Sequence, residues 1–216
     1  MVRESGAQKQ LPKVQTWMIV SLLAAVGLAS IDAPFPDVAP IHHAPTVILA
    51  LTAPWLLKRW PLSNQAVIYI TVFMLLHTMG GRYTYSNVPY DAWSTALTGH
   101  SLSTTFGFAR NHYDRLVHFA FGLCIAPVVY EVLQNYAGIG RRLALYLSIE
   151  LVFATSALYE IFEWVLTLAA AGPTADAYNG QQGDIWDAQK DMAIAAFGAF
   201  VSATRTVIDW RSSPIE

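Results

Sequence analysis

Six apolar segments of the chain each approach the length of a membrane-spanning helix, and no other feature constrains the fold as strongly. Such a helix needs about 20 mostly apolar residues, or fewer where flanking side chains reach the interface. The segments cover about residues 17–31, 43–57, 65–79, 115–133, 143–171 and 187–207. The second segment contains two prolines, and Pro127 is expected to kink the fourth. The pattern therefore predicts an all-α, polytopic membrane helix bundle with about six transmembrane helices.

The composition favours a membrane protein over a soluble one. Hydrophobic residues make up 54% and charged residues 13% of the 216 residues, and the mean hydropathy is +0.37. Soluble domains carry about 25% charged residues. The 13 basic and 15 acidic residues nearly cancel, so the chain has no basic field for nucleic acid. The single cysteine, Cys124, excludes an intramolecular disulfide framework and a multi-thiolate metal site.

The chain is expected to form one transmembrane domain over residues 1–216, with a short polar N-terminal tail (1–14). No clear cleavage pattern follows the first apolar run, which favours an uncleaved span over a signal peptide. Short loops rich in Lys and Arg stay on the cytoplasmic side, and this rule predicts an N-in/C-in topology. Nine basic residues would then lie inside: Arg3, Lys9, Lys13, Lys58, Arg59, Arg141, Arg142, Arg205 and Arg211. Four would lie outside: Arg82, Arg110, Arg115 and Lys190. The loops 80–113 and 172–184 are therefore expected to face outward.

Ionisable side chains inside spans are costly and by default indicate a functional site. Here they gather at the predicted outer ends of four spans. They are His77 in the third span, Asp114 and His118 in the fourth, Glu160 and Glu163 in the fifth, and Asp184, Asp187 and Asp191 at the start of the sixth. Spacings of three and four place side chains on one helical face. Because the loop charges put all four groups at one depth and on one side, they predict a shared polar site.

Such a cluster needs compensation, because carboxylates and imidazoles in a region of low dielectric repel one another unless protons, arginines or a cation intervene. A divalent cation, either Zn, Mn, Fe or Mg, would compensate most directly, and helix bundles build such sites from ligands at these spacings. The predicted metal ligands are Asp114, His118, Glu160, Asp187 and Asp191, with Glu163 as a further candidate. His77 is expected to be either a ligand or an acid/base group.

Two other interpretations stay open. Arg82, Arg110, Arg115 and Lys190 are adjacent in sequence to the cluster and would pair with four of its acids in a purely structural ion-pair network. Alternatively, the acids would form a path for protons or ions.

Other residues near this end have ordinary interpretations. His42, His43, His100 and His112 are expected to be solvated at the outer interface. Gly80 and Gly81, with Gly180 and Gly183, are expected to permit tight turns. The aromatic residues Trp164, Trp186, Tyr83, Tyr85 and Tyr159 would either line a pocket or form part of an aromatic girdle.

Four segments resemble the bacterial YjdF-like inner-membrane proteins, a family of unknown function. They are residues 77–85 (HTMGGRYTY), 111–118 (NHYDRLVH), 159–164 (YEIFEW) and 180–192 (GQQGDIWDAQKDM). A looser pattern, an Asp-Arg pair followed by a His at the start of one span, is similar to the VanZ-like membrane proteins. The resemblance implies a six-helix, multi-pass protein of the bacterial inner membrane. It supplies no established activity, cofactor or substrate.

The leading functional hypothesis is a metal-dependent membrane hydrolase whose site opens outward. A bound divalent metal would activate water, while Glu163 or His77 would carry the proton. Arg82 and Arg115 would neutralise a phosphate or carboxylate head group. The location predicts membrane lipids as partners and a lipid or isoprenoid-type substrate. A cation or proton carrier and a non-catalytic structural subunit are the alternatives.

Overall fold

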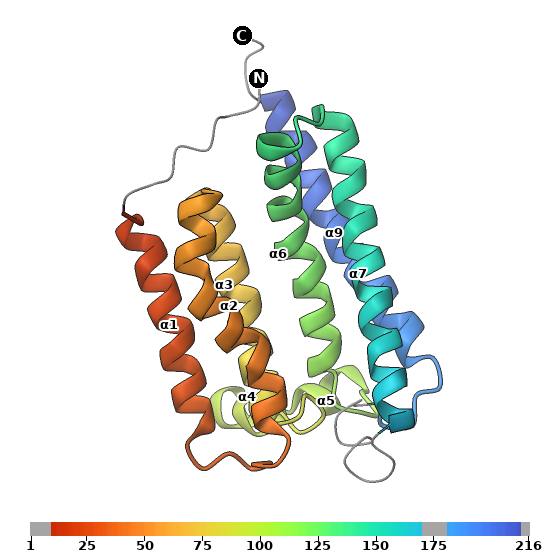
Figure 1. Ribbon diagram of the computed structural model, residues 1–216. Helices are drawn as coiled ribbons and strands as arrows, with labels where there is room; N and C mark the ends of the chain where they lie inside the picture. Colours follow the sequence, from red (N-terminus) through yellow and green to blue (C-terminus); the bar gives the residue numbers. More distant parts are fainter. Residues whose placement is uncertain (1–9, 170–180, 213–216) are drawn as a thin grey trace.

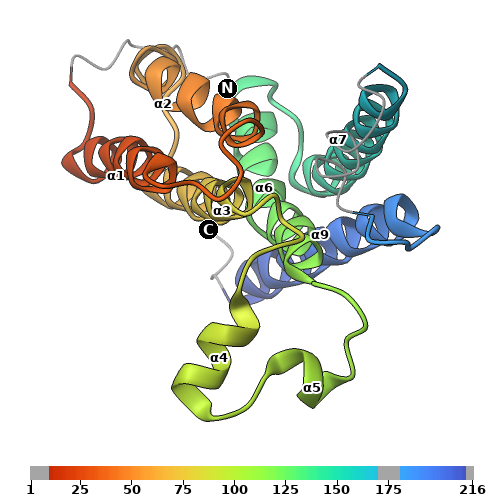
Figure 2. The ribbon, with the colours of Figure 1, turned by 90° about the horizontal axis from the view of Figure 1, so that it is seen from below.

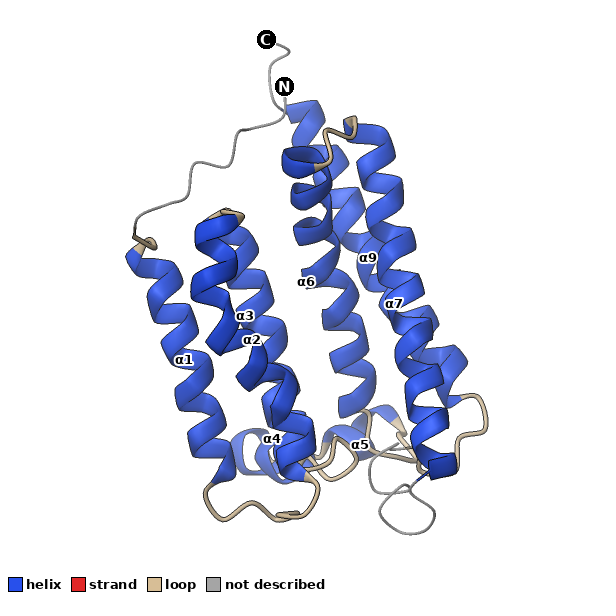
Figure 3. Cartoon of the chain, in the orientation of Figure 1, coloured by secondary structure: helices blue, strands red, loops and turns tan. Residues whose placement is uncertain are grey.

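The computed structural model describes residues 10–169 and 181–212, and over these ranges it contains eight α-helices and no strand. The helices are α1 (Lys13–Ser30), α2 (Ala39–Arg59), α3 (Asn64–Arg82), α4 (Tyr90–Thr98), α5 (Leu102–Phe106), α6 (Tyr113–Tyr136), α7 (Arg141–Ala169) and α9 (Asp187–Ser212). The all-α fold class is confirmed (Figure 3). Residues 1–9 of the predicted tail and 172–180 of the second predicted loop, Gly180 included, lie outside the described residues.

Four helices are long and apolar enough to cross a membrane: α1, α6, α7 and α9. Helices α2 and α3 run alongside them (Figure 1), but they fall outside this group. Helix α2 is less apolar than the four because it contains polar and helix-breaking residues, including His42, His43, Pro45 and Pro54. The prediction of a membrane helix bundle therefore holds in its coarser form, whereas six spans with both termini inside stay a prediction.

The outer surface of the long helices is apolar. Leu28 on α1, Leu51 on α2, Leu158 on α7 and Phe197 on α9 are 69%, 66%, 65% and 61% exposed. A soluble bundle would turn such side chains toward its core, and large contiguous apolar surfaces mark contact with lipid or protein. The exposed apolar faces, together with the four span-length helices, identify an integral membrane protein.

Helix α6 is the central element of the bundle. It packs against α3 on one side and against α7 and α9 on the other, while α1 and α2 complete the α3 side (Figure 2). The short helices α4 and α5 lie at one end of the bundle (Figure 1). They are joined by Asp91, which accepts hydrogen bonds from the Ser103 amide at 2.8 Å and the Ser101 hydroxyl at 2.9 Å. These bonds lower the pKa of the Asp91 carboxyl.

The contact between α6 and α9 depends on residues without large side chains. A Cβ added at Gly122 would lie 1.8 Å from the carbonyl oxygen of Ala195, and one added at Gly198 would lie 2.2 Å from that of Phe119. Ala195 and Ala199 on the facing surface are completely buried. Small residues let helix backbones approach closely inside membranes. This approach brings the first turns of α6 and α9 together.

Replacing Gly122 with alanine is expected to destabilise the protein by about 1–3 kcal/mol, because the new methyl group forces the two backbones apart. Gly27 on α1 is the matched control, since nothing lies within 4 Å of a Cβ added there. Gly27→Ala should be neutral or slightly stabilising through helix propensity. Thermal unfolding in detergent, followed by circular dichroism, compares the two. Equal melting temperatures would contradict the close α6–α9 contact.

Candidate functional site

The charged and histidine residues of α6 and α9 meet at the end of the bundle where both helices begin. Four of these side chains are buried: Arg115 and His118 on α6 are 8% and 9% exposed, and Asp187 and Asp191 on α9 are 4% and 2% exposed. The spacings along each helix explain this arrangement, because residues three and four apart share a face. We call this group, with Asp114, Glu160, Glu163, Asp184, Arg110 and Lys190, the acidic cluster.

One half of the acidic cluster is a network of ion pairs. The Arg115 guanidinium lies 2.5 Å from Asp187 Oδ1 and 3.2 Å from Asp184 Oδ2, and it also contacts Asp191 Oδ1. Arg110 contacts the same Asp187 oxygen and lies 3.7 Å from Asp184. A guanidinium that holds several carboxylates in this way fixes their positions. The network therefore ties α9 to α6 and to the segment before it.

Asp184 precedes α9, outside the spans, and is the most solvated acid of the network. Lys190 Nζ donates to both of its oxygens, at 2.9 and 2.7 Å. The hydrogen bond from Lys190 is the main reason why the pKa of Asp184 is lowered. Asp184 therefore stays ionised at neutral pH.

The other half of the acidic cluster, around His118 and Glu160, has fewer cations, although Asp191 also contacts Arg115 and Asp114 lies 4.0 Å from Arg110. Asp114, His118 and Asp191 each offer a ligand atom, and these three atoms lie within 4.8 Å of one another. His118 Nε2 lies 3.6 Å from Asp114 Oδ1 and 3.8 Å from Glu160 Oε1. That Glu160 oxygen is buried and has no hydrogen-bond partner among the described residues. Such an atom is rare in folded proteins and calls for a proton or a ligand.

The charges of the acidic cluster do not balance. Six carboxylates, with Glu163 close enough to interact electrostatically with Asp114 and Glu160, face three cationic side chains. If His118 is neutral, the negative charges of the cluster exceed the positive ones by about three, and the excess lies on the side of Glu160 and Glu163, because Asp114 lies 4.0 Å from Arg110. Buried like charges must be neutralised by protons or by a cation.

A cavity of about 260 Å³ adjoins Asp114 and His118 between α2, α3, α6 and α7. Its walls are mainly apolar and aromatic, and include Phe73, Phe121 and Tyr159. We call it the apolar cavity. His77 and Tyr85 line it together with Asp114 and His118, so the cavity offers an apolar volume with ionisable groups at its edge.

His77 is held on both ring nitrogens. Nε2 lies 2.8 Å from the carbonyl oxygen of His42, and Nδ1 shares a short hydrogen bond with the Tyr85 hydroxyl. Tyr85 folds back onto α3 because Gly80 has no side chain: a Cβ at Gly80 would lie 2.6 Å from the Tyr85 ring. Thr84 and Tyr85 both adopt a positive φ, of 52° and 55°, which is uncommon for residues other than glycine. The turn after α3 is therefore built to bring Tyr85 to His77.

Arg82 is not brought into the acidic cluster. Its guanidinium donates instead to the carbonyl oxygens of Ala29 and Ile31, each at 2.7 Å, at the end of α1. The last carbonyls of a helix have no partner within it, and Arg82 supplies one. Sequence adjacency to His77 could not reveal this partner, because α1 lies about fifty residues earlier in the chain.

The expectation that His42 and His43 are solvated is wrong, because they are 1% and 4% exposed. A Cβ at Gly81 would lie 2.7 Å from His42 Cβ, so Gly81 permits the close approach of α2 and α3 that buries both rings. His100 is exposed, as predicted. His112 is partly buried and stacks on Phe108 with ring centroids 4.2 Å apart, and this burial lowers its pKa.

Comparison with known proteins supports the resemblance found in the sequence. A family model described as "Predicted membrane protein (DUF2238)" matches residues 14–210. The inner membrane protein YjdF of Escherichia coli (strain K12) is 35% identical over 167 residues, which cover 77% of this chain and 73% of that protein. No solved structure matches. The similarity to the YjdF-like proteins is therefore confirmed over most of the chain.

Replacing Arg115 with glutamine is expected to destabilise the protein by about 3–5 kcal/mol, because buried Asp187 and Asp191 lose their shared partner. Thermal unfolding in detergent measures the change. Arg142→Gln is the control, since Arg142 is an exposed arginine at the other end of the bundle. Adding Asp187→Asn to Arg115→Gln should recover part of the loss, because the two residues interact directly. An Arg115→Gln protein as stable as the control would refute a structural role for the network.

Proposed function

This chain belongs to the DUF2238 family of predicted membrane proteins, and we propose that it is a metal-dependent hydrolase of the bacterial inner membrane that acts on a lipid or isoprenoid-type substrate. The observation that carries the proposal is the convergence of ligand atoms of Asp114, His118 and Asp191 within 4.8 Å of one another, beside the buried, unpartnered oxygen of Glu160. A divalent cation there would offset the unbalanced carboxylates.

The donor set fits a metal of the Zn, Mn, Fe or Mg group. Two carboxylates and one imidazole suit these ions better than Cu(I), which prefers thiolates and thioethers. Asp187, also predicted as a ligand, is engaged by Arg110 and Arg115, and we assign it to the support of the site. Glu160, 3.8 Å from His118, is the candidate for a fourth ligand. Catalytic sites with three protein ligands keep a position for water.

Each residue of the cluster has a proposed role. A metal bound at this site would lower the pKa of a water molecule and polarise a phosphoryl or acyl oxygen. Arg115 holds Asp191 and Asp187 in place through its ion pairs. Glu163 would accept or return the proton at its carboxylate. His77 would do the same across the apolar cavity, with its ring oriented by the Tyr85 hydroxyl.

The substrate class follows from the apolar cavity. Phe73, Val117 and Phe121 line a volume that suits a hydrocarbon chain, and Asp114 and His118 would meet the reacting group at its edge. Because α6 and α7 beside the cavity are long and apolar enough to cross a membrane, a lipid would enter from the side. The distribution of basic residues, nine against four, supports six spans with the acidic cluster at the outer face.

A structural role is the second candidate, favoured by the ion pairs of Arg110 and Arg115. That network accounts for Asp184, Asp187 and one oxygen of Asp191. It does not account for the buried, unpartnered oxygen of Glu160. Metal content separates the two candidates.

Purified protein is expected to contain about one divalent metal ion per chain, and Asp114→Asn and His118→Gln should each lose it because each removes one ligand. Inductively coupled plasma mass spectrometry provides the measurement. Asp37→Asn and His100→Gln are matched controls, because both residues are exposed. Wild-type protein without stoichiometric metal, or both ligand variants with full metal, would leave only the structural candidate.

Hydrolysis is tested with two lipid probes, phosphatidic acid and farnesyl diphosphate, by measuring inorganic phosphate release in detergent with added Mn²⁺ or Zn²⁺. Asp191→Asn should lower a wild-type rate by about 100-fold or more, since it removes a ligand. His77→Gln should lower it less and shift its pH dependence. If wild-type protein binds metal but hydrolyses neither probe, the metal site stands and this substrate class is rejected.

A further inference from the structure

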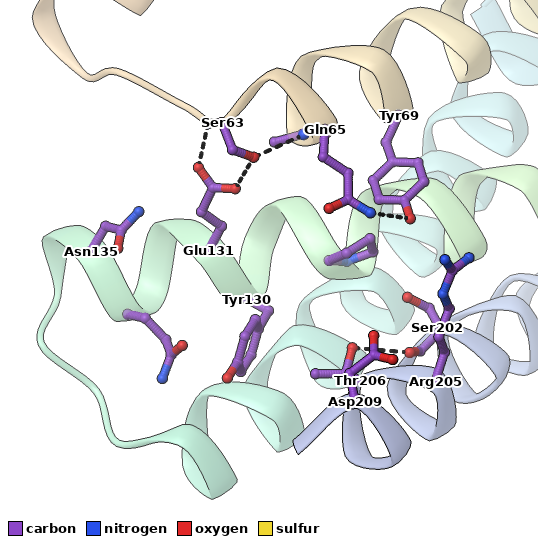
Figure 4. A pocket seen from close by; sticks show the side chains of 13 residues that line it. Ser63, Gln65, Tyr69, Tyr130, Glu131, Asn135, Ser202, Arg205, Thr206 and Asp209 are labelled. Carbon is purple, nitrogen blue, oxygen red and sulfur yellow. Dashed lines mark hydrogen bonds between the residues drawn. The ribbon is translucent and has the colours of Figure 1, made fainter. Parts of the chain in front are cut away.

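A second cavity lies at the end of the bundle opposite the acidic cluster. It has a volume of about 260 Å³ and is formed by the start of α3 and the last turns of α6 and α9 (Figure 4). Eleven of its thirteen lining side chains are polar or charged, whereas the apolar cavity is lined mainly by hydrocarbon and aromatic groups. This polar pocket therefore suits a small polar ligand, and an acyl chain would find few apolar contacts in it.

The α3 and α6 walls of the polar pocket are fixed by one carboxylate. Glu131 on α6 accepts hydrogen bonds from the amide and the hydroxyl of Ser63, both at 2.6 Å. The Ser63 hydroxyl in turn accepts from the Ala66 amide at 3.1 Å and caps α3. Figure 4 shows Glu131 and Ser63 facing each other across the two helices. A negative charge is thus held at a defined position before any ligand binds.

The α9 wall supplies both signs of charge. Arg205 and Asp209 both line the pocket and are one helical turn apart. Arg205 is exposed, and among the pocket residues drawn in Figure 4 no hydrogen bond reaches its guanidinium. An exposed arginine at the edge of a polar pocket is suited to a phosphate group, which it meets with two parallel hydrogen bonds.

The charged side chains that line the polar pocket indicate which kind of ligand it suits. The lining carries both signs of charge, with Arg205 beside Glu131 and Asp209, so a purely anionic head group would meet two carboxylates as well as the arginine. A zwitterion places its phosphate at Arg205 and its ammonium group near the carboxylates, and so satisfies both signs. Tyr130, Gln134 and Asn135 also line the pocket and add hydrogen-bonding groups.

The position of the pocket favours a lipid as the source of this head group. It lies at the ends of membrane helices, and Val201, one turn before Arg205 on the same face, is 39% exposed. Val132 on α6, next to Glu131, is 38% exposed. We propose that the polar pocket binds the phosphoethanolamine head group of a phospholipid, whose acyl chains lie along the apolar surfaces of α6 and α9. This proposal is independent of the metal site.

The test is the stability of the full-length protein in detergent with added lipid. Dioleoyl phosphatidylethanolamine at about ten times its dissociation constant should raise the melting temperature by about 3–6 °C, since a ligand stabilises the state that binds it. Dioleoyl phosphatidylglycerol should give less than half of this shift. Arg205→Gln should abolish the shift, whereas Arg142→Gln, an exposed arginine at the same end, should retain it.

Variants and a soluble probe complete the test. Asp209→Asn should reduce the preference for phosphatidylethanolamine over phosphatidylglycerol, because it removes one negative charge. Glycerophosphoethanolamine, which has no acyl chains, distinguishes the two sources of the head group. A shift with the lipid alone means that binding needs the acyl chains of a membrane lipid, and a shift with both compounds means that the head group is sufficient. Equal shifts with both phospholipids, an unchanged response of Arg205→Gln, or no shift with either ethanolamine compound would overturn the proposal.

Discussion

The close approach of α6 and α9 determines where the charged residues of this protein lie. Gly122 and Gly198 remove the side chains that would hold the two backbones apart, and the first turns of both helices then share one buried space. Arg115, Asp187 and Asp191 belong to these turns. The cost of removing two opposite charges from water is offset only where they meet in close, hydrogen-bonded contact. The small residues in the middle of the helices are therefore a condition for the ion pairs at their ends.

Those ion pairs divide the acidic cluster into two parts with different consequences. Around Arg110 and Arg115 the carboxylates are paired, and the segment before α9 is fixed onto α6. Around His118 the carboxylate oxygens of Asp114 and Glu160 lie 3.6 and 3.8 Å from Nε2, and these contacts are ion pairs only if His118 is protonated. The paired part gives rigidity, whereas the unpaired part keeps ligand atoms available. A preorganised site requires both properties, because ligands must be held before a cation arrives.

The sequence predicted the location of the acidic cluster better than its internal contacts. Loop charges and spacings of three and four were enough to place Asp114, His118 and Asp191 together, because both can be read from short stretches of the sequence. The partner of Arg82 and the burial of His42 and His43 depend on how α1, α2 and α3 approach one another. Tyr85 needed a turn with positive φ, for which the neighbouring Gly80 and Gly81 were the only visible signal. Four of the six predicted spans are long and apolar enough to cross a membrane. Helix α2 is not among them, because its prolines and histidines reduce its apolar character.

The two cavities extend the division of the molecule into ends with different chemistry. Both have walls from α3 and α6, yet the apolar cavity adjoins Asp114 and His118, whereas the polar pocket adjoins Arg205, Glu131 and Asp209. Phe73 of α3 lines the first and Tyr69, one turn earlier, lines the second, so the same helix serves both. The walls of the first suit a hydrocarbon chain, and those of the second suit a zwitterionic head group. The two ends therefore select for different parts of an amphipathic molecule, and a change confined to Arg205 should leave metal binding at Asp114 unaltered, because sites this far apart without shared partners act independently.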